Sequence, residues 1–319
     1  MKALQVNTFE DDVQLTEIPT PSPKPSEILL KIEACGLNFA DLLMRKGTYQ
    51  DTPTPPFTLG LEVCGTVEEL GTDTTDLNIG DRVAVFGGQG GLAEYGVFPS
   101  ELCFRISEKM TAEEAAGFQV AYGTSHLALS HRAQLKSGET LVVLGAAGGV
   151  GLTAVEIGKL MGATVIAFAR GAHKVNIAKE AGADFAYDSD EVDLRDVIKS
   201  HGGADVVYDP IGGDQFKAAL RACNREARVV VIGFASGSVP QIAANHILVK
   251  NITVIGFYWG GYLKFAPERL KDSMTELMEW YDQGKLKPHI SHVFKLQDGS
   301  LALDTLEARK STGKVVVTP

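Results

Sequence analysis

The segment from residue 141 to residue 161 combines an apolar run, a glycine-rich turn and a helical pattern, in that order. Residues 141–144 predict a buried strand, and residues 145–151 supply the turn. Glycine lacks the Cβ atom that would hold the backbone away from a phosphate, and a helix N-terminus presents free N–H groups. This order is typical of the pyrophosphate site of a dinucleotide cofactor. The residues that it assigns to the cofactor are Ala147, Gly148, Gly149 and Val150.

The turn is a variant of the G-x-G-x-x-G pattern, because Ala146 stands where the first glycine is usual. A glycine-rich packing turn without a ligand is the alternative interpretation. We favour the nucleotide site, since both the preceding strand and the following helix are predicted.

The residues after the next expected strand, at 164–168, indicate which dinucleotide binds. In an NAD site a carboxylate about twenty residues past the turn holds the ribose 2′-hydroxyl. Here Arg170 and Lys174 occupy this region, and no Asp or Glu lies between them. Arg can bind a phosphate with two N–H groups and Lys adds a point charge, so the pair predicts the 2′-phosphate of NADPH. The alternative is that both side chains are solvated at a strand–helix corner.

The secondary-structure elements that must position these residues follow two different patterns along the chain. Short strands are expected over 27–33, 61–68, 81–86 and 93–98, separated by Gly, Pro or Asp, as in a compact barrel-like unit. After residue 113 a helical pattern over 113–129 leads into strands that alternate with helices, which predicts a doubly wound parallel sheet. The expected domains are residues 1–119, a nucleotide domain over 120–258, and a return to the first domain over 259–319.

Charge and composition exclude several classes of protein. The net charge is −10, and nucleic acids and anionic membrane surfaces both bind basic faces. No apolar run is long enough to span a bilayer, and Glu10, Asp11 and Asp12 follow the N-terminus without an apolar signal core. We therefore expect a cytoplasmic protein with no nucleic-acid or membrane partner. The four cysteines have no close spacing, so neither a disulfide framework nor a zinc knuckle is predicted.

Several separate segments resemble the zinc-free quinone oxidoreductases of the medium-chain dehydrogenase/reductase superfamily, the group that includes zeta-crystallin. The segments lie at residues 35–41, 45–49, 59–62, 80–83, 146–151 and 308–317. Each is weak alone, and in this order they are specific. The resemblance implies an α/β protein, with a GroES-like β-rich barrel domain and a doubly wound Rossmann domain.

Zinc-dependent relatives differ from this chain at their metal ligands. They begin the first segment with Cys-Gly-x-Cys-His, whereas this chain keeps Cys35 but has Asn38 and Phe39 in the last two places. Their second segment reads Gly-His-Glu, and Leu61 replaces that ligand histidine here. A catalytic zinc needs three protein ligands and an open position, so we predict an enzyme without a metal.

Without zinc, oxidation of an alcohol has no Lewis acid, whereas a quinone or a conjugated enone accepts hydride readily. The segment that resembles the family's substrate site offers three candidate catalytic residues. Asn38 could donate to the acceptor carbonyl or to the nicotinamide amide, or be held in a local turn. Asp41 is either a general acid or a helix cap. Tyr49 is either a proton donor lining the cleft or a half-buried packing residue.

The resemblance also implies further site residues. Thr124 matches the place that meets the nicotinamide, and Tyr187 matches an aromatic residue near the adenosine. Phe234 lies in a loop that matches the family's cofactor-lining loop, and Arg309 could reach the cofactor phosphates or be solvated. In the aromatic segment 257–262, Tyr258 and Trp259 could line the acceptor cleft or pack in a core or interface.

The sequence thus predicts an NADPH-dependent reductase of quinones that works by hydride or electron transfer. One alternative is a reductase of enones, enals or enoyl thioesters, and another is a non-catalytic NADPH-binding protein with a structural or regulatory role. By resemblance we expect a homodimer that pairs the edge strands of its nucleotide domains, with residues 252–255 as that edge.

Overall fold

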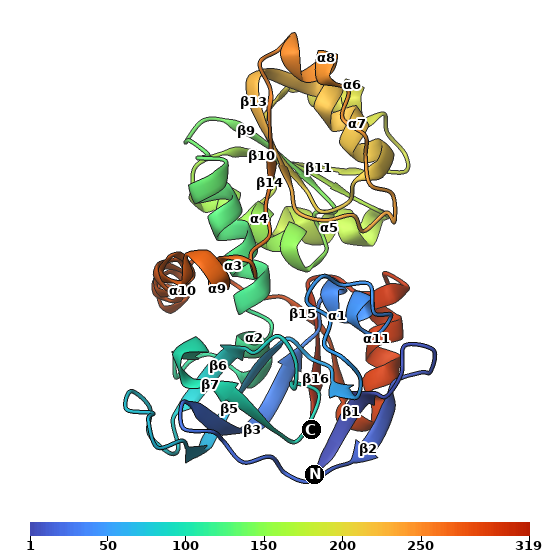
Figure 1. The fold of residues 1–319 in the computed structure, drawn as a ribbon. Helices are drawn as coiled ribbons and strands as arrows, with labels where there is room; N and C mark the ends of the chain where they lie inside the picture. The colour runs from blue at the N-terminus through green and yellow to red at the C-terminus, as the bar shows by residue number, and fades with distance from the viewer. The chain divides into compact units, whose positions relative to one another are not determined.

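The computed structural model describes residues 1–319, which form two compact units (Figure 1). The first unit contains Met1–Val120 and Pro288–Pro319, and the second contains Ala121–Lys287. Both ends of the chain therefore belong to the first unit.

The first unit is built mainly from antiparallel strands. One sheet has the order β15-β16-β3-β5-β6-β8, with β7 beside β3, and a smaller sheet has the order β2-β1-β4. Its strands are β1 (Lys2–Val6), β2 (Gln14–Glu17), β3 (Glu27–Gly36), β4 (Phe57–Thr58), β5 (Glu62–Leu70), β6 (Arg82–Phe86), β7 (Tyr95–Pro99), β8 (Cys103–Arg105), β15 (Ile290–Lys295) and β16 (Lys314–Thr318). Its helices are α1 (Phe39–Met44), α2 (Ala112–Ala116) and α11 (Gly299–Glu307).

The second unit is a six-stranded parallel sheet of order β11-β10-β9-β12-β13-β14. The strands are β9 (Thr140–Leu144), β10 (Thr164–Ala169), β11 (Phe185–Asp188), β12 (Ala204–Asp209), β13 (Cys223–Val231) and β14 (Thr253–Gly256). Helices α4 (Gly149–Leu160) and α5 (Ala172–Glu180) cover one face, and α6 (Leu194–Ser200) and α7 (Gly213–Ala222) cover the other (Figure 1). The remaining helices are α3 (Gln119–Leu127), α8 (Ala244–Leu248), α9 (Tyr262–Phe265) and α10 (Pro267–Asp282).

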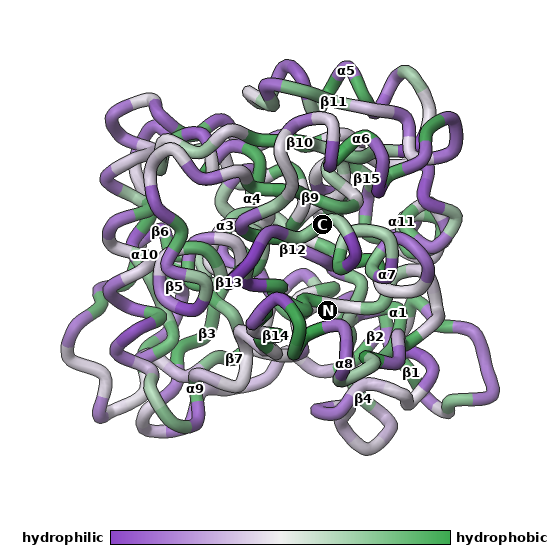
Figure 2. Tube along the Cα trace, turned by 90° about the horizontal axis from the view of Figure 1, so that it is seen from above, coloured by the Kyte–Doolittle hydropathy of each residue, from purple (hydrophilic) through white to green (hydrophobic).

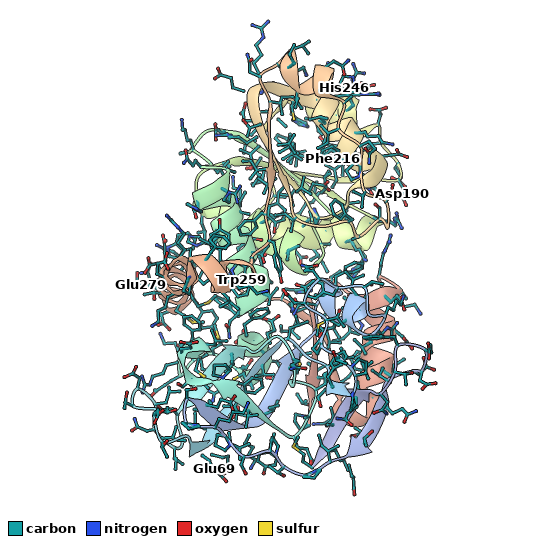
Figure 3. The ribbon with its side chains drawn as sticks, viewed as in Figure 1. Glu69, Asp190, Phe216, His246, Trp259 and Glu279 are labelled. Carbon is teal, nitrogen blue, oxygen red and sulfur yellow. The ribbon has the colours of Figure 1, made fainter.

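Burial on both sheet faces explains why these strands are apolar along their length. Leu141–Leu144 in β9 are completely buried, and this strand is coloured as hydrophobic in Figure 2. Phe216 of α7, on the sheet face that α6 and α7 cover, points into the core of the second unit (Figure 3). The predicted doubly wound sheet is confirmed.

The second unit includes residues 259–287, which the sequence-based division placed in the first domain. Helix α10 belongs there because Leu270, Met274 and Leu277 are buried, and because Ser273 Oγ lies 2.8 Å from His126 Nδ1 of α3. An amphipathic helix does not show in its own sequence which unit it covers, so the boundary depends on these contacts.

Both ends of the second unit are bonded to the same residue of α4. Glu156 accepts hydrogen bonds of 2.6 Å from the hydroxyl of Tyr122 and of 2.6 Å from the backbone N–H of Lys287. The points at which the chain enters and leaves this unit are therefore both attached to α4.

The single helix expected over 113–129 is two helices, α2 and α3, separated by Gly117 and Phe118. Gly117 ends α2, and a Cβ atom there would lie 3.2 Å from side-chain atoms of Ile290 and Lys314. The break follows from close packing between segments far apart in sequence, which helical periodicity does not report.

No helix combines the length and the apolar character needed to cross a lipid bilayer.

Candidate functional site

The glycine-rich turn lies between β9 and α4, as predicted. Gly145 has a φ of +60°, and a Cβ atom on Gly151 would lie 2.2 Å from the Gly145 carbonyl oxygen, so both positions require glycine. Gly148 is the N-cap residue of α4, and no side chain caps this 12-residue helix. The first-turn amides of Gly149, Val150 and Gly151 have no partners within the helix. These amides and the helix dipole form a site that fits a pyrophosphate.

Three buried hydroxyl groups hold the first turn of α4 in place. Ser125 Oγ lies 2.8 Å from the Val150 carbonyl oxygen, 2.8 Å from Thr153 Oγ1 and 3.0 Å from the hydroxyl oxygen of Tyr208. Thr153 also donates to the Ala121 carbonyl oxygen at 3.0 Å. The network joins α3, α4 and β12. Its bonds to the backbone go to carbonyl oxygens, so the first-turn N–H groups of α4 can still bind a ligand. Thr124, the predicted nicotinamide contact, is buried beside Ser125 in α3.

The first of the predicted 2′-phosphate residues, Arg170, directly follows β10. Arg170 Nε lies 3.1 Å from a carboxylate oxygen of Asp190, and both side chains are more than half exposed. The N–H of Gly171 donates to Asp188 at 2.9 Å, and Lys174 lies in the first turn of α5. The corner therefore contains two carboxylates that the sequence did not place beside the two cations.

The aromatic residues predicted to line the site differ in burial. Tyr187 packs against Phe168, with ring centroids 6.0 Å apart, and its hydroxyl oxygen lies 2.6 Å from His201 Nε2. Phe234 and Tyr258 are 38% and 39% exposed, so both present ring surface to solvent.

Trp259, labelled in Figure 3, is only 6% exposed. A Cβ atom on Gly123 would lie 2.6 Å from Trp259 Nε1, so glycine in α3 allows the indole to pack closely. These contacts fit the core-packing alternative for Trp259, whereas Tyr258 retains the exposure that a cleft residue needs.

In the first unit, the ammonium group of Lys314 lies in a buried polar network. Its Nζ atom donates to the Leu37 carbonyl oxygen at 2.7 Å, to Asn38 Oδ1 at 2.8 Å and to Glu62 Oε1 at 2.6 Å. Glu62 is completely buried and also accepts from Asn38 Nδ2 at 2.9 Å and from the Val120 N–H at 2.9 Å. The network connects β16, β5 and the segment before α1.

This network determines what the three candidate catalytic residues can do. Both polar atoms of the Asn38 side chain are engaged within it. Asp41 is completely buried, and its carboxylate accepts from the N–H groups of Asn38 at 2.8 Å and Gly60 at 3.2 Å, which fits the helix-cap alternative. Tyr49 is half-buried against the core of the first unit.

Burial changes the acid–base properties of this cluster. Desolvation raises the pKa of Asp41 from 3.8 to about 7, although the N–H of Asn38 and the charge of Lys314 favour the ionised form. Desolvation, together with the charges of Asp41 and Glu62, also raises the pKa of Cys35 well above its ordinary value, so its thiol is neutral.

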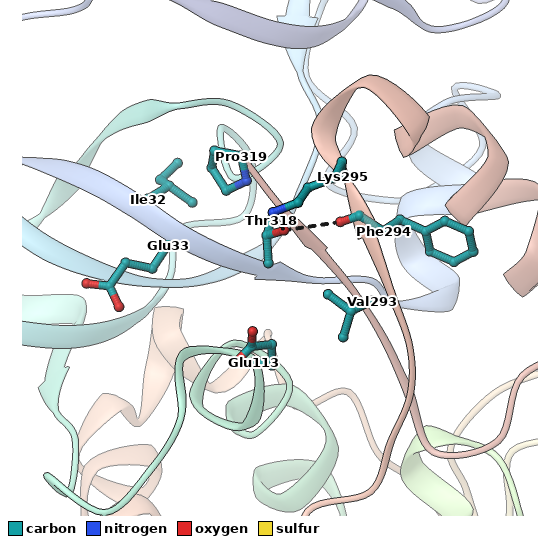
Figure 4. A pocket seen from close by; sticks show the side chains of 8 residues that line it. All are labelled: Ile32, Glu33, Glu113, Val293, Phe294, Lys295, Thr318 and Pro319. Atoms are coloured by element: carbon teal, nitrogen blue, oxygen red, sulfur yellow. Dashed lines mark hydrogen bonds between the residues drawn. The ribbon is translucent and has the colours of Figure 1, made fainter.

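Two features of the first unit lie apart from this network. Arg309 is exposed in the turn after α11, with a φ of +55°. A pocket of about 440 Å³ is lined by residues that include Glu33, Glu113 and Lys295 (Figure 4). Lys295 Nζ donates to Thr318 Oγ1 at 3.2 Å. No predicted site residue lines this pocket, so it is not part of the candidate site.

The chain matches known proteins over both units. Residues 24–108 match the family model of the alcohol dehydrogenase GroES-like domain, and residues 149–280 match that of the zinc-binding dehydrogenases. The quinone oxidoreductase-like protein 2 homolog of Nematostella vectensis is 39% identical over 92% of this chain and 81% of its own length. The synaptic vesicle membrane protein VAT-1 homolog of Homo sapiens is 33% identical over 97% of this chain and 84% of its length.

A solved structure agrees with these matches. The quinone oxidoreductase of Thermus thermophilus, whose structure is also known in complex with NADPH, has a TM-score of 0.88 at 32% identity and covers 100% of both chains. The chain belongs to the zinc-free quinone oxidoreductase family of the medium-chain dehydrogenase/reductase superfamily. The resemblance found in the sequence, with its GroES-like and Rossmann domains, is confirmed.

In this family member no group of three or more His, Cys, Asp or Glu side chains could hold a metal ion. Cys35, which matches a zinc ligand of the zinc-dependent relatives, instead lies in the electrostatic field of Asp41, Glu62 and Lys314. That the reaction needs no metal stays a prediction.

Sequence reasoning gave no role to Glu62, Lys314, Ser125, Thr153 or Tyr208. Only Lys314 leaves a faint signal, as a charged residue directly before the apolar run 315–317. Their hydrogen-bond partners lie in elements that are distant in the chain, so a local sequence pattern cannot identify these partners.

Replacing Lys314 with Met should lower the free energy of unfolding by about 3–5 kcal/mol, because Glu62 would remain buried without its cation. Urea unfolding followed by circular dichroism measures this loss. The control is the double variant Lys314→Met with Glu62→Gln, which removes both charges and should recover part of the loss. A loss below about 1 kcal/mol in the single variant would contradict the assignment of a buried pair.

Stability should also depend on pH through Asp41. Its pKa is raised to about 7 in the folded chain, so the folded state holds a proton that the unfolded state releases above about pH 4. The contribution of Asp41 to the free energy of unfolding is therefore largest below pH 4 and falls as the pH rises toward 7.

Urea unfolding at pH 5, 6, 7 and 8 tests this, with Asp41→Asn as the variant that cannot ionise. The stability of the parent chain relative to the variant should fall between pH 5 and 7 and then level off. Parallel pH profiles for the two proteins would show that Asp41 does not titrate in this window.

Proposed function

We propose that this family member is an NADPH-dependent oxidoreductase that reduces quinones without a metal ion. The single observation that carries the proposal is the N-terminus of α4, where glycine residues expose uncapped amides directly after a buried parallel strand. Membership in the quinone oxidoreductase family, and the NADPH complex of the Thermus thermophilus relative, support the choice of cofactor and acceptor.

The residues that would hold NADPH are those that the sequence assigned. The amides at Gly149 and Val150, with Ala147 and Gly148 in the turn, would bind the pyrophosphate. Arg170 and Lys174 would bind the 2′-phosphate. Thr124, Tyr187, Phe234 and Arg309 complete the proposed set. When bound, NADPH supplies a hydride from C4 of its nicotinamide ring.

The chain's own contribution to the reaction is orientation, exclusion of water and delivery of one proton. A quinone that receives a hydride needs one proton to become the hydroquinone, and a donor near its oxygen stabilises the charge that develops there. Tyr49 is our candidate for that donor, because Asp41 is fully buried and the Asn38 side chain is engaged by Lys314 and Glu62. Asn38 and Asp41 would then act as positioning residues, and Tyr258 would line the acceptor cleft.

Initial rates of NADPH oxidation, measured with a 1,4-quinone, an ortho-quinone and an α,β-unsaturated aldehyde, test the proposed reaction. We expect faster turnover with a quinone than with the aldehyde, because a quinone accepts hydride with less activation by the protein. Faster aldehyde turnover would assign the chain to alkene reduction. NADPH binding without turnover on any acceptor would favour a non-catalytic role and would overturn the proposed activity.

We also propose that the chain forms a homodimer through the edge strand β14. This strand has a hydrogen-bonded neighbour only on the β13 side, and exposed apolar side chains occur just before it, at Leu248 (73%) and Val249 (68%). An uncovered apolar edge invites pairing with another strand, and a second copy of this chain offers the same edge.

Sedimentation velocity at micromolar concentration should show a dimer for the parent chain and a monomer for Leu248→Lys with Val249→Lys. The added charges would have to be buried at the shared edge, whereas a single chain already exposes both positions. Leu301→Lys is the matched control, because Leu301 is 57% exposed on α11 of the other unit. A monomeric parent chain, or a dimer that persists in the double variant, would refute the proposed interface.

A further inference from the structure

The proposed 2′-phosphate corner contains a carboxylate within contact distance of its arginine. Arg170 Nε lies 3.1 Å from Asp190 Oδ2, with side chains that are 60% and 56% exposed. Asp190 follows β11 and is labelled in Figure 3. The ion pair therefore lies at the surface, where a dissolved ligand can reach both groups.

The backbone around Asp190 is fixed by its neighbours. Asp188, the last residue of β11, accepts from the Gly171 N–H through Oδ2 at 2.9 Å and from the Asp190 N–H through Oδ1 at 3.1 Å. Ser189 N–H donates to the Ala169 carbonyl oxygen at 2.9 Å. These bonds tie the loop after β11 to the turn after β10. The backbone of Asp190 is thus held next to the turn that carries Arg170.

This arrangement has an electrostatic consequence for a phosphorylated ribose. With Nε directed at Asp190, Arg170 has its two terminal nitrogens left as donors for a phosphate. A phosphate held by those nitrogens would lie near the Asp190 carboxylate, and like charges repel. An unphosphorylated ribose carries no charge and would not experience this repulsion.

We infer that Asp190 is a specificity-determining residue, which weakens the preference of this chain for NADPH over NADH. The inference rests on the proposed function, because it takes Arg170 as the residue that binds the 2′-phosphate. Asp190 acts through the charge it places beside Arg170 and takes no part in hydride transfer.

The test is the dissociation constant of NADPH and of NADH for Asp190→Asn, measured by quenching of protein fluorescence in the full chain. Asparagine has nearly the same size and shape as aspartate, so the variant removes the charge beside Arg170 Nε and changes little else. We expect NADPH to bind about two- to five-fold more tightly, the range of a single exposed charge interaction, and NADH to bind as before.

The matched control is Asp196→Asn, which removes the same charge from another exposed Arg–Asp pair of this unit, at Arg195 on α6. It should change neither constant. Raising the salt concentration to about 1 M should shrink the gain of Asp190→Asn, since screening then acts within a few ångströms.

The inference is overturned if Asp190→Asn leaves NADPH affinity unchanged or lowers it, or if it changes NADPH and NADH affinity equally. The variant Arg170→Ala distinguishes an error in the role of Asp190 from an error in the 2′-phosphate assignment. If Arg170→Ala loses NADPH affinity but Asp190→Asn has no effect, only the role of Asp190 is wrong. If Arg170→Ala binds NADPH as the parent does, the 2′-phosphate assignment fails, and the role of Asp190 fails with it. A parent chain that does not bind NADPH at all would refute the proposed function itself.

Discussion

A single buried positive charge constrains how the last strand of the chain, β16, joins the sheet of the first unit. Lys314 is the only lysine or arginine among its buried residues, and its three donors are matched by oxygen atoms of Leu37, Asn38 and Glu62. A charge removed from water without such partners costs several kcal/mol, so β16 can join the sheet only where those oxygens are present. The network thereby attaches the last strand of the chain to residues that lie 252 to 277 positions earlier.

The same network holds the segment that was predicted, by resemblance, to contain the substrate site. Asn38 is bonded to Lys314 and Glu62, and Asp41, in the first turn of α1, accepts from the N–H groups of Asn38 and Gly60. Asn38 and Asp41, two of the predicted catalytic residues, are therefore hydrogen-bonded within the chain. Preorganisation of this kind suits a reaction in which the cofactor carries the chemistry and the protein supplies position.

The candidate site of the second unit is formed mainly by backbone amides, whereas the polar network of the first unit is formed mainly by side chains. The candidate binding groups of the second unit are the first amides of α4. The hydroxyls of Ser125 and Thr153 bond to the Val150 carbonyl oxygen of that turn, and the Tyr208 hydroxyl bonds to Ser125. At the other end of the proposed nucleotide, two cations and two carboxylates share one corner. In the proposed binding mode, the amides would bind the part that all dinucleotides share, and the balance of surface charge would discriminate among dinucleotides.

Much of the fold was predictable because local patterns report it. Apolar runs that alternate with helices predicted the parallel sheet, and the glycines at 145–151 predicted the turn between β9 and α4. The family followed from the order of several short segments. Loss of the zinc ligands was visible as single residues, such as Leu61 in place of histidine.

Tertiary structure decided what depends on contacts between distant segments. Helix α10 joins the second unit through Ser273 and His126, and the expected helix over 113–129 breaks where Gly117 packs against Ile290 and Lys314. Asn38 and Asp41 proved to be engaged within the chain, and Asp190 proved to pair with Arg170. Sequence periodicity records the environment that each residue needs, whereas the partner that supplies this environment is chosen only when the chain has folded.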